Sequence, residues 1–278
     1  MDFFILGNPR SGTTLLRLIL NNHSLIGVPP ESGFLQWWYK KYYNWSENDT
    51  NNDTKVNLFL DDILSSKKIE DWQLNKDKLK TFILSKNPKN YKELITSIYK
   101  FYTNNKLLIG DKNNYYINYL DELNLICPNV KYIHLVRDGR DVACSYKNIN
   151  KLNPNLKYLP KVSSDIVAIA SEWNNNITKI VNFIENHDSI TIRYEDLISQ
   201  PIDTLKKIGD FLHVEYEEEM LNYYQDNDEP LSTLHWKGKT QETIDGKNKK
   251  KYLSLLSSEE INKFNEIAYN TLKKFEYD

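Results

Sequence analysis

The stretch Phe3-Phe4-Ile5-Leu6-Gly7-Asn8-Pro9-Arg10-Ser11-Gly12-Thr13-Thr14 passes from four apolar residues through a turn into a helical pattern that begins at Leu15. A short strand, a glycine-containing loop and a helix in this order are the context that a phosphate-binding loop requires. Such a loop presents unpaired backbone N–H groups and the positive end of a helix dipole to an anion. The stretch therefore predicts an anion site directly after the first strand of an α/β fold.

The spacing of Gly7 and Gly12 matches the triphosphate-binding loop of NTPases, but Thr13 stands where that loop carries a lysine. Arg10 is the cation of this loop instead. An NTPase needs the lysine on the β- and γ-phosphates and an acidic Mg²⁺ site beside it, so a triphosphate ligand is disfavoured. The alternative of a plain strand-to-helix turn with a hydroxyl N-cap leaves Arg10 unexplained.

Short β-rich runs alternate with longer helical patterns along the chain, which is typical of a parallel sheet with crossover helices. Strands are expected at Phe3–Leu6, Lys106–Ile109, Val130–Val136 and Ser189–Ile192. Helices are expected at Thr14–Asn22, Tyr116–Ile126, Val142–Asn148, Ser163–Glu185, Ile202–Leu212 and Ser257–Phe275. Ser257 and Glu260 have capping-box spacing, and the polar stretch Asn44–Lys55 is expected to be a mobile loop. Ligands of parallel sheets bind beyond the carboxyl ends of the strands, so the chemistry should lie just after them.

The composition limits the class of protein. The chain has 278 residues, 40% of them hydrophobic, so it can bury a substantial core, and no linker divides it. Its formal charge of −2 argues against a nucleic-acid partner. No apolar run is long enough to cross a bilayer or to form a signal-peptide core, so no membrane partner is expected. Cys127 and Cys144 form no disulfide framework or metal-ligand spacing, so a reducing, cytoplasmic setting is the default.

A second candidate anion site follows the third expected strand. Arg137 stands at the end of this strand, Asp141 is placed to cap the next helix, and Ser145 falls about one turn into that helix. The guanidinium and the hydroxyl can converge on one anion through hydrogen bonds. The alternative is that the arginines of this turn form structural ion pairs, Arg137 with Asp138 or Arg140 with Asp141.

Both candidate anion sites resemble motifs of a known family. Pro9–Leu16 resembles the 5′-phosphosulfate loop of sulfotransferases, especially the bacterial, carbohydrate and tyrosylprotein branches. Leu135–Val142 resembles their 3′-phosphate motif and stands at a typical distance from the first. These enzymes take a sulfonate from PAPS (3′-phosphoadenosine-5′-phosphosulfate) and release PAP. The resemblance implies a P-loop NTPase-like α/β fold of three layers, with a central parallel sheet flanked by helices. It also implies a single sulfotransferase domain over residues 1–278, with a variable substrate-side insertion at about 35–105.

The resemblance also implies the residues that hold the donor. Those that match the ligands of its 5′ end are Arg10, Ser11, Gly12, Thr13 and Thr14. Arg10 would also reach the transferring sulfonate, while Arg137 and Ser145 match the 3′-phosphate ligands. Tyr194 matches a tyrosine that can pack on adenine, although simple core packing would explain it equally. Lys251, beside Tyr252, matches a basic residue that closes over the donor, although the family more often has Arg-Trp there.

Sulfonyl transfer needs a base for the acceptor hydroxyl and cations for the bridging oxygen that leaves, and this scheme requires no metal. Glu31 matches the base of tyrosylprotein and several carbohydrate sulfotransferases, although a glutamate beside prolines is ordinarily unremarkable. Lys112 matches the lysine that supports the leaving group. The cytosolic small-molecule branch has a catalytic histidine in this region, and no histidine lies near Lys112 in the sequence. Glu31 is therefore the predicted base.

The acceptor is predicted only as a hydroxyl of a small molecule, a carbohydrate or a tyrosyl residue. The aromatic side chains between Trp37 and Trp45 can line a pocket for a sugar or a phenol, or can pack on the core. The alternative functions are a nucleotide or small-molecule kinase that uses Gly7–Thr14 for ATP, and a noncatalytic nucleotide-binding or partner-binding protein. The missing lysine argues against the first, and the presence of both Glu31 and Lys112 argues against the second.

Overall fold

The computed structural model describes residues 1–277, with only the backbone described for Leu231, Ser232 and Leu234. Its strands are β1 (Phe3–Leu6), β2 (Ile26–Gly27), β3 (Leu108–Lys112), β4 (Lys131–Val136) and β5 (Ser189–Arg193). Its α-helices are α1 (Thr13–Asn21), α2 (Phe34–Trp37), α3 (Tyr39–Tyr42), α4 (Glu47–Thr50), α5 (Asp53–Leu64), α6 (Lys76–Lys86), α7 (Tyr91–Tyr102), α8 (Leu120–Ile126), α9 (Gly139–Ile149), α10 (Ile166–Ile184), α11 (Tyr194–Ser199), α12 (Pro201–Leu212), α13 (Leu231–Lys237), α14 (Tyr252–Leu255) and α15 (Ser258–Lys274). Short 3₁₀ helices are η1 (Ile69–Trp72), η2 (Asn114–Asn118), η3 (Glu218–Asn222) and η4 (Gly238–Gln241).

The strands form one parallel sheet in the order β2-β3-β1-β4-β5. In its register, Ile5 of β1 pairs with Lys112 of β3 on one side and with Ile133 of β4 on the other. Because parallel strands end at the same edge, the residues at and just after the ends of β1, β3 and β4 lie close together. The predicted parallel sheet is confirmed, and the four expected strands are present. The two-residue strand β2 was not predicted, since two residues carry no periodicity.

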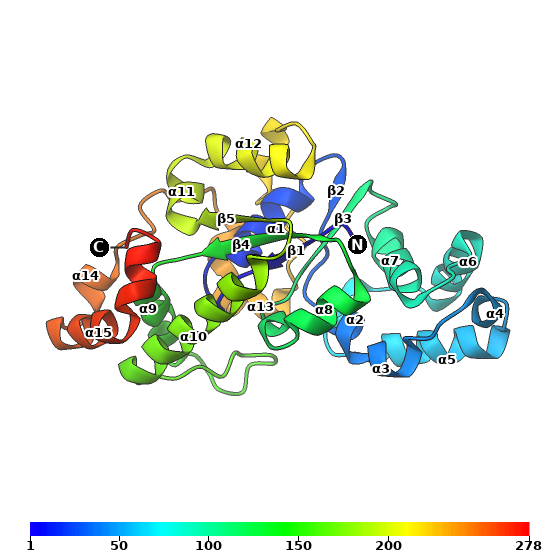
Figure 1. The fold of residues 1–278 in the computed structure, drawn as a ribbon, viewed down its shortest axis with the longest axis horizontal. Helices are drawn as coiled ribbons and strands as arrows, with labels where there is room; N and C mark the ends of the chain where they lie inside the picture. Colours follow the sequence, from blue (N-terminus) through cyan, green and yellow to red (C-terminus); the bar gives the residue numbers. More distant parts are fainter. Residues whose placement is uncertain (278) are drawn as a thin grey trace.

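Helices cover both faces of the sheet (Figure 1). All four residues of β1 are buried, and successive side chains of a strand point to opposite faces. Phe3 and Ile5 pack in a core cluster with α1 and α12, whereas Phe4 and Leu6 pack in another cluster with α7, α8 and α10. Figure 1 shows α12 on one side of the strands and α8 and α10 on the other. These layers confirm the predicted three-layer α/β class.

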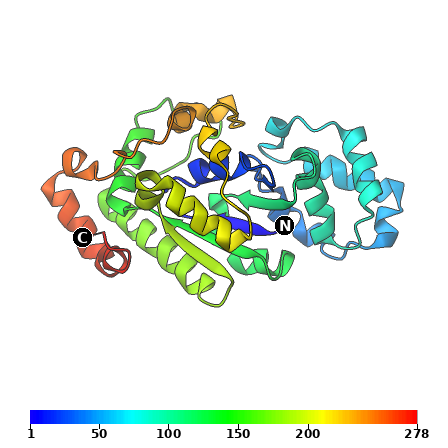
Figure 2. The same cartoon turned by 90° about the horizontal axis from the view of Figure 1, so that it is seen from above.

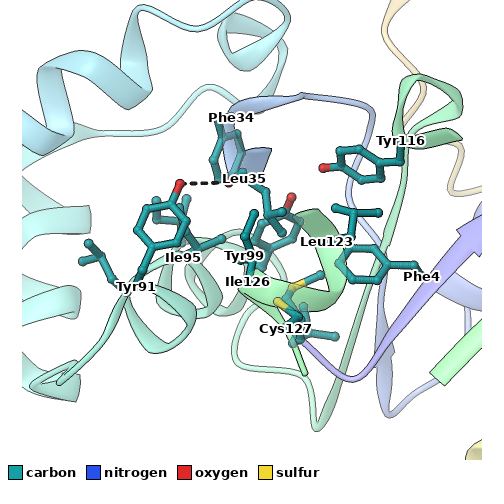
Figure 3. Close-up of a cluster of buried hydrophobic side chains, with 14 of the residues drawn as sticks. Phe4, Phe34, Leu35, Tyr91, Ile95, Tyr99, Tyr116, Leu123, Ile126 and Cys127 are labelled. Atoms are coloured by element: carbon teal, nitrogen blue, oxygen red, sulfur yellow. Dashed lines mark hydrogen bonds between the residues drawn. The ribbon is translucent and has the colours of Figure 1, made fainter. Parts of the chain in front are cut away.

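The helices α2 to α7 occupy residues 34–102, the segment in which we expected a variable insertion, and Figures 1 and 2 both show α4 to α6 at one end of the molecule. Their inner face belongs to the same core as the sheet. Figure 3 shows Tyr99 of α7 beside Leu123 of α8, with Phe4 of β1 on one side of the same cluster and Tyr91 on the other. The Tyr91 hydroxyl donates a hydrogen bond of 2.8 Å to the Leu35 carbonyl, which joins α7 to α2. That the chain is a single domain with an inserted segment stays a prediction.

The expectation of a mobile loop at Asn44–Lys55 is wrong. This stretch forms α4 and the beginning of α5, and Ser46 and Asp49 make a capping box at the start of α4. Trp45 is buried, and its indole N–H donates a hydrogen bond of 2.9 Å to the buried Thr50 hydroxyl. One tryptophan can bury a large apolar surface, which holds an otherwise polar segment against the core. The polar composition of this stretch therefore gave the wrong prediction.

Other helix boundaries follow from local capping. The capping box of Ser257 and Glu260 is confirmed at the start of α15. The helix expected from Tyr116 begins only at Leu120, because the 3₁₀ turn η2 comes first. Within residues 1–277, no helix has both the length and the apolar character needed to cross a membrane.

Candidate active site

A pocket of about 660 Å³ lies where the sheet's carboxyl edge meets the later loops. Pockets of a few hundred to about 1,000 Å³ hold ligands of cofactor size. The predicted residues that line it are Arg10, Gly12, Thr13, Thr14, Glu31, Arg137, Ser145, Tyr194 and Lys251. Ser11 and Lys112 are fully buried and do not line it directly. The pocket thus brings together most of the side chains that the two motifs singled out.

The loop after β1 has a backbone that only some residues tolerate. Gly12 has a φ of 92°, and a Cβ atom there would lie 2.4 Å from the Tyr194 ring. Arg10 also has a positive φ, of 72°, a conformation that is uncommon for a residue with a side chain and that concentrates at functional sites. The buried Ser11 hydroxyl has no hydrogen-bond partner within the described residues. A loop with these features is suited to close contact with an anionic ligand.

Arg10 links the two motifs. Its Nε donates to the Ser145 hydroxyl at 3.0 Å, and its terminal nitrogen donates to the Trp236 carbonyl at 2.7 Å. Arg137 in turn donates to the Arg10 carbonyl at 3.2 Å. Burial and repulsion from Arg137 lower the pKa of Arg10 to about 10, so the guanidinium remains charged at neutral pH. Two cations that repel one another favour an anionic ligand that neutralises both.

Arg137, the residue predicted to bind a second anion, has its guanidinium 4.4 Å from the centroid of the Tyr194 ring. The Tyr194 hydroxyl accepts a hydrogen bond of 2.6 Å from the Asn248 side chain, and the ring lies on Gly12. Tyr194 is therefore both packed and part of the pocket wall. The Nε of Arg137 is buried without a hydrogen-bond partner in the described part of the chain. Arg137 retains capacity to bind a ligand, as a 3′-phosphate site requires.

The ion pairs at this turn differ from those considered from the sequence. Asp138 pairs with Arg140 at 2.8 Å, and its side chain, not that of Asp141, accepts from a backbone N–H at the start of α9. The prediction that Asp141 caps this helix is wrong, because the helix begins at Gly139. The Asp141 carboxylate instead accepts from the Tyr252 N–H at 3.0 Å and lies 3.8 Å from Arg137.

Lys251 lies at the rim of the pocket near Lys239, which also lines it. Burial and the neighbouring Lys239 lower the pKa of Lys251 to about 8. An anionic ligand would offset this repulsion and raise the pKa again. Lys251 contacts none of the motif residues by a hydrogen bond or ion pair in the described residues, and its closure over the donor stays a prediction.

Glu31 lies among three lysines. Its carboxylate contacts the Lys112 ammonium directly, lies 2.9 Å from that of Lys68, and lies 4.0 Å from that of Lys237. Burial by itself would raise the pKa of Glu31, but Lys112, Lys237 and Lys68 hold it well below its usual range. Glu31 is therefore ionised at neutral pH, as a general base must be. The sequence implied a role for both Glu31 and Lys112, but it predicted none of the contacts of Glu31 with the three lysines.

Lys112 connects Glu31 to the first turn of α1. It is the last residue of β3, and its ammonium donates both to Glu31 and, at 3.2 Å, to the Thr14 hydroxyl. Burial lowers the pKa of Lys112 to about 8, with the attraction of Glu31 acting against this shift and Lys237 adding to it. The sequence placed the strand a few residues early, so Lys112 is within the strand rather than after it.

A buried ion network sets the position of Lys237. Arg17 of α1 pairs with Asp228 at 2.7 Å and with Glu229 at 2.8 Å, and Lys237 pairs with Glu229 at 2.7 Å. Removing one partner of a buried pair typically costs about 3–5 kcal/mol, because the other charge stays buried. This network therefore holds the segment that carries Lys237 against α1. No local motif predicts this network, because Arg17 lies more than 200 residues before its three other members in the sequence.

Most of the aromatic residues near the start of the 34–102 segment pack in the hydrophobic core. Trp38, Tyr39, Tyr42 and Trp45 pack in or against the largest hydrophobic cluster. No residue from Trp37 to Trp45 lines the pocket. Of the two interpretations, core packing is therefore correct for these four. In residues 1–277, no group of three or more His, Cys, Asp and Glu side chains is arranged to hold a metal ion.

Comparison with known proteins identifies the family. A family model described as the sulfotransferase family matches residues 2–218. The chain belongs to the sulfotransferase family. The prediction of a PAPS-dependent sulfotransferase, an enzyme that transfers a sulfonate group, is confirmed at this level, and the kinase alternative loses its support.

Individual relatives of this sulfotransferase agree with the assignment. A putative protein-tyrosine sulfotransferase of Caenorhabditis briggsae is 26% identical over 224 residues, which cover 80% of this chain and 69% of the relative. The solved sulfotransferase domain from the curacin biosynthetic pathway superimposes with a TM-score of 0.64 at 22% identity, covering 97% of this chain and 96% of its own. Mouse sulfotransferase SULT7A1, solved in complex with PAP, gives a TM-score of 0.51 at 14% identity, covering 96% and 82%. These structural likenesses confirm the predicted fold class.

Proposed function

We propose that this sulfotransferase uses Glu31 as the general base for the transfer of a sulfonate from PAPS to an acceptor hydroxyl. The observation that carries the proposal is the contact of Glu31 with Lys112, whose ammonium also reaches Thr14 of the phosphate loop. The proposed base, Glu31, and the cation Lys112 are thus connected to Thr14, which we assign to the donor's 5′ end. Transfer of this kind needs a base on the acceptor side and positive charge at the leaving oxygen.

The residues present fit the donor. We assign its 5′ end to Arg10, Ser11, Gly12, Thr13 and Thr14, and its 3′-phosphate to Arg137 and Ser145. The buried Ser11 hydroxyl and Arg137 Nε, which lack partners among the described residues, support this assignment because buried polar groups are normally paired. We further assign the adenine contact to Tyr194 and closure over the donor to Lys251. The mouse relative solved with PAP supports the choice of nucleotide.

In the proposed reaction, Glu31 accepts the proton of the acceptor hydroxyl as its oxygen forms a bond to sulfur. Arg10 and Lys112 neutralise the charge that develops on the bridging oxygen as the sulfur–oxygen bond to the leaving group breaks. When bound, PAPS supplies the activated sulfonate. Arg10 and Lys112 can neutralise the charge on the bridging oxygen by themselves, so the proposal assigns no role to a metal ion.

The acceptor and the setting are part of the same proposal. We propose a hydroxyl of a small molecule, a carbohydrate or a tyrosyl residue, and the name of the C. briggsae relative supports the tyrosyl case. We also propose a reducing, cytoplasmic setting, supported by Cys127 and Cys144, which are both buried and not disulfide-bonded.

The donor assignment predicts that PAP stabilises the protein against thermal unfolding without magnesium. A ligand that binds only the folded state adds about 2.7 kcal/mol to its stability at a hundredfold excess over Kd. The measurement is a thermal-shift series with PAP, AMP and ATP–Mg²⁺ at matched concentrations. Stabilisation by ATP–Mg²⁺ without any by PAP would refute the donor assignment.

The pKa of Lys112 predicts an alkaline limit of activity. The cation needed at the leaving oxygen is almost fully protonated about two pH units below its pKa, and it is lost as the pH rises through that pKa of about 8. In the free enzyme, kcat/KM for PAPS should therefore fall above that pH, and Lys112→Arg should remove the fall because arginine keeps its charge. The pKa of Lys251 is also about 8, so Lys251→Arg is the matched variant. A fall that persists in Lys112→Arg and disappears in Lys251→Arg would assign it to Lys251.

A further inference from the structure

Of the three lysines around Glu31, two already have another partner. Lys112 also donates to Thr14, and Lys237 lies closer to Glu229, at 2.7 Å, than to Glu31, at 4.0 Å. Lys68 lies 2.9 Å from Glu31 and pairs with no other carboxylate in the described residues. Glu31 is therefore the carboxylate with which Lys68 forms an ion pair, and Glu229 acts on Lys68 more weakly.

The surroundings of Lys68 hold it at this place. Its backbone has a φ of 67° at the start of η1, and its N–H donates to the Tyr158 hydroxyl at 3.4 Å. Its ammonium lies 5.7 Å from the centroid of the Tyr158 ring. The Tyr158 hydroxyl donates to Glu70 at 2.6 Å, and the Ser32 hydroxyl donates to the Lys67 carbonyl at 3.2 Å. The contacts with Tyr158 and Ser32 thus hold the backbone of Lys67 and Lys68 in place.

Lys68 and Tyr158 line the pocket together with Glu31, but none of the contacts given above joins either to a residue assigned to the donor. Lys68 comes from the 34–102 segment, and Tyr158 from the segment between α9 and α10. Both segments thus contribute to the surroundings of the base. Lys112, in contrast, must share its charge with the leaving oxygen once the donor is bound.

We propose that Lys68 is a positioning residue for the base, which keeps the Glu31 carboxylate ionised and oriented when Lys112 serves the leaving oxygen. This inference rests on the proposed role of Glu31. The other charged groups that face Glu31 are Lys112 from β3, Lys237 from α13 and Arg10 from the loop after β1, with Glu229 beside Lys237. Loss of Lys68 would remove one of these positive charges and would raise the pKa of Glu31.

The test compares Lys68→Met with Lys68→Arg and with Lys67→Met, a matched control because the Lys67 side chain is exposed. Selective carbon-13 labelling of glutamate carboxyls follows the titration of Glu31 in the PAP complex, and Glu31→Gln identifies its resonance. Lys68→Met should raise the midpoint by about 1 pH unit, as expected for loss of a neighbouring opposite charge. Lys68→Arg and Lys67→Met should leave the midpoint near that of the wild type.

Turnover provides a second measurement, with 4-nitrophenol and a tyrosine-containing peptide as acceptors at saturating PAPS. Relative to the wild type, Lys68→Met should lose up to about tenfold more activity below the wild-type midpoint of Glu31 than at neutral pH, because a smaller fraction of Glu31 is then ionised. An unchanged Glu31 midpoint in Lys68→Met would overturn the inference even if the variant is less active. If Glu31→Gln retains full turnover, the proposed function fails instead, so the two failures are distinguishable.

Discussion

Glu31→Gln is expected to lower sulfonate transfer by about 10²- to 10⁴-fold, the usual contribution of a positioned general base. The amide keeps the size of the side chain but cannot accept the proton of the acceptor hydroxyl. PAP affinity should be retained or should increase, because the loss of a carboxylate beside Lys112 and Lys68 leaves more positive charge for an anionic ligand. The measurements are turnover under single-turnover conditions and PAP binding by calorimetry.

The matched control for this prediction is Glu185→Gln, which changes an exposed glutamate at the end of α10 and should alter neither quantity. Glu31→Gln also leaves Lys112 buried without its carboxylate, so some loss of thermal stability is expected. Thermal unfolding with and without PAP separates this effect from catalysis. If PAP binding falls as much as turnover does, Glu31 supports the structure of the pocket and is not the base.

The sequence predicted those parts of the site in which a charged residue stands within a short strand–loop–helix pattern. The loop around Arg10 follows a buried strand and precedes a helix, so its context is complete within a dozen residues. Arg137 and Ser145 stand at a strand end and on the next helix, which is again local. That the two motifs meet follows from the parallel sheet, because β1 and β4 are neighbours and end at the same edge.

The residues that the sequence did not predict depend on distant contacts. Lys68 and Lys237 are two of many lysines in this chain, and a lysine ordinarily lies in solvent. Lys237 pairs with Glu229, which is in turn paired with Arg17 of α1. Such a network has no spacing to recognise, since its members come together only when the tertiary fold has formed. The buried Trp45 was missed for a related reason, because its polar neighbours dominate the local composition.

Arg137→Ala is expected to weaken PAP binding by about 10- to 150-fold and to leave AMP binding nearly unchanged. PAP carries the 3′-phosphate that AMP lacks, and loss of a hydrogen bond to a charged group costs roughly 1.5–3 kcal/mol. Ser145→Ala should show the same selectivity with a smaller loss, because a neutral hydroxyl adds no charge. The loss is also limited because Ser145 is a partner of Arg10, whose Nε is then free to turn to the ligand. Binding of both nucleotides is measured by calorimetry.

Arg137 has structural contacts as well, with the Tyr194 ring and the Arg10 carbonyl, so the comparison of two nucleotides is essential. A general distortion of the pocket would weaken PAP and AMP alike. Arg140→Ala is the matched control, because Arg140 is also buried and stacked on a tyrosine, Tyr252, but pairs with Asp138 and does not line the pocket. It should lower stability without discriminating between the nucleotides. Equal losses for PAP and AMP in Arg137→Ala would mean that Arg137 supports the fold or the 5′ site, and the 3′-phosphate would then have to bind elsewhere in the pocket.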